Sequence, residues 1–259
     1  MRMMKKVLGT VPVLALSVSL LAGCGSTAAS PVSSAASTAA ESTTSSVVSE
    51  TTSAAADENV AAAAQLLNDL TGSYQELWPV ILADEYQQTW LDDCTALVGE
   101  ENAEAAFEKL SSMVTGDVYG EDAVEAYANG GGAYFCGFTN SLAILTFDGE
   151  TSTISGTDKD GNVLFSHTYH YIGMEPVHGL YEFESDDADS GEFTYFFLAP
   201  DTSAETYHIE FRYGSDAEAL SQYDAGEYAY WVASGISTDC DQTMIDNCIE
   251  LFCTENLAG

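Results

Sequence analysis

Polar and apolar residues alternate with a period of two through the second half of the chain, as expected for strands with one buried face. The alternation predicts strands over residues 134–139, 142–147, 151–156, 163–172, 179–184, 192–198 and 207–213. Asp148-Gly149 and Asp160-Gly161 between them are typical hairpin turns. Six or seven short consecutive strands favour an antiparallel sheet that curls into a barrel or half-barrel.

Before the strands, apolar residues recur at helical spacing. The pattern predicts helices over residues 57–70, 77–82, 86–98 and 102–114, and Gly130-Gly131-Gly132 then interrupts the chain. After the strands, Ser215 or Asp216 is predicted to cap a helix that runs to Tyr223, and a last helix covers 243–251. The predicted fold class is α+β and mainly β, an antiparallel barrel with a helical N-terminal lead-in and C-terminal helices.

The N-terminus has the three parts of a secretory signal peptide. A basic start is followed by an apolar run over 7–22 that is short for a membrane span. The run ends in Leu21-Ala22-Gly23-Cys24, which resembles the bacterial lipobox. That resemblance implies cleavage after residue 23, acylation of Cys24 (palmitate among the chains) and anchoring of the lipoprotein at the extracellular face of the bacterial cell membrane. The alternative is an ordinary secretory signal with an incidental cysteine.

Residues 24–57 contain almost only Ser, Thr, Ala and Val, with no aromatic residue. Such a segment buries too little apolar surface to offset its ordering entropy, so we interpret it as a disordered tether behind the lipidated cysteine. Residues 58–259 hold all the Tyr, Phe and Trp and are long enough for one domain with a sizeable core.

The charge balance limits the partners of this domain. The chain has 6 Lys and Arg against 41 Asp and Glu, and three of the basic residues lie in the signal peptide, which leaves 3 − 41 = −38. Phosphate binding needs a basic surface, so no nucleic-acid partner is expected. Cations, basic peptides and neutral ligands fit better. Solubility alone is the alternative reason for the acidity.

Five cysteines follow Cys24, and no Cys-x-x-Cys pair occurs among them. A thiolate zinc site therefore has no support from spacing. The odd number leaves at least one thiol unpaired in a monomer. A disulfide among Cys240, Cys248 and Cys253 is one option, but the sequence does not determine the pairing.

The order of elements resembles the ZinT/YodA family of bacterial zinc-binding proteins. The helical lead-in contains the segment Leu70-Thr71-Gly72-Ser73-Tyr74-Gln75-Glu76-Leu77-Trp78-Pro79, followed later by Phe183-Glu184 and Gly191-Glu192-Phe193-Thr194-Tyr195. His208-Ile209-Glu210 and Gly214-Ser215-Asp216 come next, before an aromatic cluster that contains Tyr228, Tyr230 and Trp231. The resemblance covers about residue 68 to the C-terminus and implies a calycin-like, lipocalin-type barrel.

The family binds zinc through three histidines, two of them in a His-x-His strand. Carried onto this sequence, the metal ligands become Asp201, His208 and Glu210. The resemblance also implies a zinc ion and a metal ABC transporter as partners. Residues 208 and 210 are two apart on a predicted strand, so both side chains leave the same face. Imidazole and carboxylate groups suit Zn²⁺, and the carboxylates would also accept Mn²⁺ or Ca²⁺. The alternative is that they are the solvent-facing half of the strand.

The remaining candidates favour structural roles. His167 and His170 are predicted to face opposite sides of one strand, and His178 to lie in a turn. The acidic segment 184–189 lacks the ligand spacing of a calcium loop and is predicted to be a hairpin tip. No catalytic motif occurs, so we do not expect an enzyme. The sequence favours metal capture for homeostasis. The alternatives are a metal-free lipocalin-like module for a small ligand and an acidic surface protein.

Overall fold

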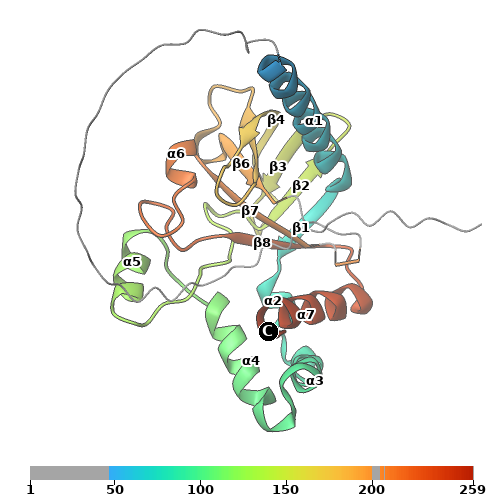
Figure 1. The fold of residues 1–259 in the computed structure, drawn as a ribbon, viewed down its shortest axis with the longest axis vertical. Helices are drawn as coiled ribbons and strands as arrows, with labels where there is room; N and C mark the ends of the chain where they lie inside the picture. The colour runs from blue at the N-terminus through green and yellow to red at the C-terminus, as the bar shows by residue number, and fades with distance from the viewer. Residues whose placement is uncertain (1–46, 200–204, 207, 259) are drawn as a thin grey trace, which may run out of the picture.

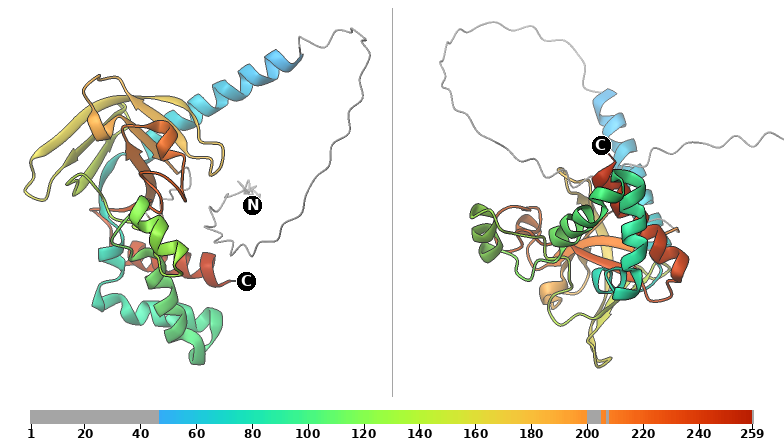
Figure 2. Two further views of the ribbon diagram at one scale, coloured as in Figure 1. Left: turned by 90° about the vertical axis from the view of Figure 1, so that its left-hand side faces the viewer. Right: turned by 90° about the horizontal axis from the view of Figure 1, so that it is seen from below.

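The computed structural model describes residues 47–199, 205–206 and 208–258, with side chains described from Glu58 on. A barrel lies on a layer of helices (Figure 1 and Figure 2). The strands are β1 Gly72–Glu76, β2 Ile144–Asp148, β3 Thr153–Thr157, β4 Val163–Met174, β5 Tyr181–Ser185, β6 Tyr195–Leu198, β7 His208–Gly214 and β8 Ala233–Ser237. The helices are α1 Val47–Asp69, α2 Trp78–Ile81, α3 Gln87–Val98, α4 Glu100–Val114, α5 Glu121–Ala128, α6 Ala217–Leu220 and α7 Gln242–Leu257, with 3-10 turns η1 Asp84–Tyr86 and η2 Gly191–Phe193.

The eight strands form a closed antiparallel barrel in chain order, which confirms the predicted fold class. Closure comes from β1, which pairs with both β2 and β8. Tyr74 of β1 lies opposite Leu145 on one side and Ser237 on the other. A closed barrel has no free sheet edge, so every strand is paired on both sides.

Aromatic side chains fill the barrel. The buried rings of its core include Phe147, Phe165, Phe183, Phe196, Phe211, Tyr213 and Trp231. Helix α1 packs against the barrel, and its Leu66 and Leu67, with Leu70 just after it, belong to the same core. Gly149, in the β2–β3 turn, allows this approach, since a Cβ at this position would lie 2.4 Å from the Cα of Asn68.

The second core lies between the barrel and the layer formed by α2, α3, α4 and α7. Trp90 of α3 is fully buried there, and its indole nitrogen donates to the carbonyl of Ile81 at 2.7 Å. The ring of Phe252, from α7, packs edge-on against Trp90. The C-terminal helix α7 is thus packed against α3 beneath the barrel. Within the described part of the chain, each helix is too short or too polar to cross a bilayer.

Several predicted elements differ from the structure. Residues 134–139 form no strand: Phe135 makes isolated bridges to Thr115 and Trp231. β1, β8 and α5 were not predicted at all, so the lead-in is not entirely helical. Helix α1 begins at Val47, inside the segment interpreted as a tether. The pairing of β1 with β8 closes the barrel, so residues 134–139 are not one of its strands, although Phe138 packs in its core.

The α3–α7 contact contains a carboxylate in an unfavourable place. Burial, followed by the charges of Glu250, Asp246 and Asp92, raises the pKa of Asp93 above its ordinary value. Its Oδ2 atom is buried and has no hydrogen-bond partner within the described residues. A raised folded-state pKa stabilises the fold below the unfolded pKa, near 4, and this contribution is lost as pH rises through the folded value.

We therefore expect Asp93→Asn to stabilise the protein at pH 7 by about 0.5–1 kcal/mol, because it removes like-charge repulsion between the two helices. Urea denaturation at pH 7 and pH 5 measures this, and the gain should shrink at the lower pH. Asp117→Asn is the matched control, since Asp117 is exposed and is not among the charges that raise the pKa of Asp93. A loss of stability in the Asp93 variant at pH 7 would contradict this reading.

Candidate metal site

The candidate site lies on the outer face of β7. Ile209, Phe211 and Tyr213 point into the barrel core, so the intervening residues point outward. His208 and Glu210 are both partly exposed and leave this outer face together, as their spacing predicted. In the ladder, Glu210 lies opposite Ser234 of β8.

The imidazole of His208 has a defined neighbour. Its Nδ1 lies 2.7 Å from the hydroxyl oxygen of Thr206. When Nδ1 donates to that oxygen, the ring lone pair is on Nε2, which is the tautomer of a metal-binding histidine whose other nitrogen is hydrogen-bonded. Thr206 was not predicted as a site residue, although its position two residues before His208 places it on the same face of an extended chain.

Helix α7 borders the strand at this end. Asn247 donates to the carbonyl of Glu205 at 2.8 Å, and the Cys248 thiol donates to that of Thr206 at 3.2 Å. These contacts hold residues 205 and 206 against the helix. The ring of His208 is therefore placed from two sides, by its own strand and by α7.

Glu210 lies among buried groups. Burial, and then the negative charge of Glu210, raises the pKa of the Cys136 thiol well above its usual range. Burial is also the main cause of the raised pKa of Tyr223, to which Glu210 adds a smaller contribution. The Glu210 carboxylate is therefore within electrostatic reach of the Cys136 thiol and the Tyr223 hydroxyl. A cation bound by Glu210 would offset this negative charge.

The two other predicted site residues, Asp201 and Cys24, lie outside the described residues. Within the described ranges, no group of three or more His, Cys, Asp or Glu side chains could hold a metal ion. Of the three predicted ligands, His208 and Glu210 lie on the same face of β7, and their binding of a metal ion stays a prediction. These donor types, with Thr206 behind the imidazole, fit a zinc or related divalent ion.

Arg212 is the next outward residue of β7 and was not singled out in the sequence. It is fully buried, and its guanidinium donates to the carbonyl oxygens of Leu220, Gln222 and Tyr228. The guanidinium carbon lies 4.2 Å from the ring centre of Tyr223. Burial lowers the pKa of Arg212. These hydrogen bonds hold residues 220–228, which follow β7, against that strand.

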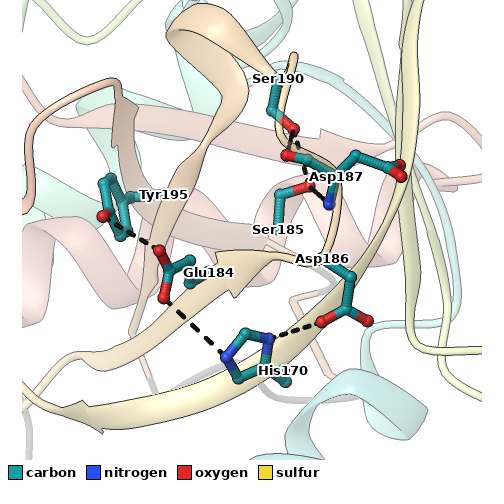
Figure 3. A network of polar contacts seen from close by, with 7 residues as sticks. All are labelled: His170, Glu184, Ser185, Asp186, Asp187, Ser190 and Tyr195. Atoms are coloured by element: carbon teal, nitrogen blue, oxygen red, sulfur yellow. Dashed lines mark hydrogen bonds and ion pairs between the residues drawn. The ribbon is translucent and has the colours of Figure 1, made fainter.

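The other histidines contact carboxylates. His170 of β4 lies opposite Glu184 of β5, and its Nδ1 is 2.8 Å from Asp186 (Figure 3). Its Nε2 lies 3.9 Å from Glu184, which also accepts from the Tyr195 hydroxyl at 3.2 Å. His167, on the opposite face of β4, lies 2.8 Å from Asp187. The two histidine rings thus contact the acidic hairpin tip, residues 184–189, from opposite faces of β4.

Hydroxyl groups close the same tip. The Ser190 hydroxyl donates to Ser185 at 2.7 Å and to the carbonyl of Asp187 at 2.8 Å (Figure 3). The backbone N–H of Asp187 donates to the Ser185 hydroxyl at 3.1 Å. This closed turn agrees with the predicted hairpin tip. His178 lies in a turn, as predicted, with its ring 3.8 Å from that of Tyr223.

The alternative function, a metal-free lipocalin-like module, would need a cavity for a small ligand inside the barrel. Rings at the positions where a lipocalin-type cavity would lie, such as Phe196 and Phe211, are completely buried. A cavity of about 340 Å³ lies outside the barrel instead, between α2, the end of α4 and residues 135–137. Its walls include Trp78 and Phe135, so it is largely apolar.

Comparisons with known proteins give likenesses to solved structures. Neither a family model nor a curated protein matches the sequence. The Zn(II)-bound ZinT-like domain of AdcA from Streptococcus pneumoniae is 15% identical, with a TM-score of 0.44, over 70% of this chain and 87% of that one. Zn(II)-bound AdcA from the same organism is 14% identical, with a TM-score of 0.41, over 71% of this chain and 34% of that one.

Proposed function

We propose that this chain is a lipid-anchored lipoprotein of the bacterial cell surface whose barrel domain captures a divalent metal ion, zinc foremost. The observation that carries the proposal is the outward pair on β7, His208 and Glu210, with Thr206 hydrogen-bonded to the imidazole. Cys24 would hold the lipid, and the tether would let the domain reach ions beyond the membrane.

In this proposal His208 binds the metal through Nε2 and Glu210 through a carboxylate oxygen. Asp201 is the proposed third ligand, because the resemblance to the ZinT/YodA family carries a ligand position onto it. One imidazole and two carboxylates neutralise Zn²⁺ and leave a fourth position for water or for a receiving protein. A site with an open position can release its ion, which suits delivery to a metal ABC transporter.

The test is isothermal titration of Zn²⁺ into the mature chain carrying Cys24→Ser. We expect one site for the parent and a loss of affinity on the order of 100-fold or more in His208→Ala/Glu210→Ala, since even outer-shell changes cost 10–100-fold. The matched control is His170→Ala/Glu184→Ala, which removes an imidazole and a carboxylate from neighbouring strands of the same barrel. Equal binding by all three proteins would reject the site.

A further inference from the structure

Two of the cysteines that follow the lipobox meet in the helical layer. Cys94 lies on α3 and Cys253 on α7, and their sulfur atoms are 3.9 Å apart. Both side chains are completely buried. The pair joins positions 159 residues apart in sequence, on the first long helix of the layer and on the last helix of the chain.

The remaining thiols of the domain have other neighbours. The Cys248 thiol donates to the carbonyl of Thr206, and the Cys136 thiol lies 3.9 Å from the carbonyl of Tyr134. Cys240 is partly exposed, at the turn before α7. The contact between Cys94 and Cys253 is therefore not a general crowding of cysteines. The sequence did not determine which of the five cysteines pair, and this contact identifies Cys94 and Cys253 as a candidate pair.

We propose that Cys94 and Cys253 form a disulfide that fastens α7 to α3. Closing the sulfurs from 3.9 Å to the bond length of about 2.05 Å takes side-chain rotation and a small shift of the helices. Two S–H bonds break and one S–S bond forms. The two electrons reduce the disulfide of a thiol oxidoreductase or of oxidised glutathione to two thiols, which take up the two protons.

The crosslink would act on the whole domain. The loop it closes contains every strand of the barrel except β1, because β1 precedes α3. Such a long loop loses much chain entropy in the unfolded state when it is closed. Burial raises the pKa of both thiols, so oxidation is expected before the helices pack rather than in the finished fold. This inference is independent of the proposed metal site.

Peptide mapping tests the pairing directly. The mature chain carrying Cys24→Ser is refolded with oxidised glutathione, alkylated in denaturant and cleaved after glutamate. Cleavage after Glu85, Glu100, Glu250 and Glu255 separates Cys253 from Cys248. We expect one reducible species that joins peptide 86–100 to peptide 251–255, with the other three thiols alkylated. Alkylation of all five, or a bond from Cys94 to Cys240 or Cys248, would overturn the proposal.

Melting curves give the second readout. Oxidised protein should melt at least about 5 °C above reduced protein, given the length of the closed loop. The difference should persist in Cys248→Ser, which changes another buried thiol of α7, and vanish in Cys253→Ser. If Cys253→Ser does not fold, the peptide map of the parent decides. A redox shift that survives in folded Cys253→Ser would also refute the assignment.

Discussion

Replacing Arg212 with methionine is expected to lower the free energy of unfolding by about 3–5 kcal/mol. The guanidinium is buried and donates to three carbonyl oxygens of the segment that follows β7. Methionine matches its length but donates no hydrogen bond. The carbonyls of Leu220 and Tyr228 would then stay buried without this partner, and that of Gln222 would lose it as well. Urea denaturation followed by tryptophan fluorescence measures the loss.

Lys159→Met is the matched control for this prediction. It removes the same charge from an exposed turn, so the free energy of unfolding should change by no more than about 0.5 kcal/mol. Arg212→Lys should fall between the two, because one ammonium group cannot reproduce the planar arrangement of donors. A methionine variant within 1 kcal/mol of the parent would show that the segment is held by other contacts.

The second large effect is expected at the centre of the barrel. Phe196→Ala should destabilise the protein by about 3–5 kcal/mol, because it leaves a cavity among rings that cannot collapse freely. The Phe196 ring is fully buried and lies 5.4 Å from the rings of both Tyr169 and Tyr213. The same denaturation experiment measures it.

Val177→Ala provides the comparison, since Val177 is 73% exposed and its truncation should cost no more than about 0.5 kcal/mol. If Phe196→Ala were equally mild, the barrel would not be packed as described. Its interior would then have room for a ligand, as the lipocalin-like alternative requires.

Strands in which buried and exposed residues alternate could be predicted from the sequence, whereas β1 and β8, which close the barrel, could not. β4 alternates between buried and exposed residues because one of its faces meets solvent. β8 is buried over four consecutive residues, since helices cover its outer face, and so it shows no alternation. Gly235 is small because Ile209 and Phe138 pack against this position. A short strand of Ala, Ser and Gly therefore gives no strand signal.

Helix ends were predicted less well for a related reason. The helix expected to run to Tyr223 ends at Leu220, although Asp216 caps its start as predicted. The guanidinium of Arg212 donates hydrogen bonds to the carbonyl oxygens of Leu220 and Gln222. In a longer helix these oxygens would accept from backbone N–H groups instead. Helix α7 runs on to Leu257 because Cys248, Ile249 and Cys253 belong to the core beneath the barrel. Tertiary contacts set both boundaries.

For the candidate site, spacing predicted the shared face of His208 and Glu210, since it depends only on strand geometry. The contact of Thr206 with His208 and the burial around Glu210 depend on α7 and on the segment after β7. Those segments approach β7 only in the folded chain. The contact between Cys94 and Cys253 could not be predicted from the sequence for the same reason, because helix packing alone brings them together.

The most direct test of the metal-capture proposal is anomalous diffraction at the zinc edge from crystals of the mature chain grown with Zn²⁺. The proposal predicts one strong peak about 2.0–2.2 Å from a ring nitrogen of His208 and a carboxylate oxygen of Glu210, with Asp201 as a further ligand. No peak at His208, or a peak only beside His170 and Asp186, would contradict it.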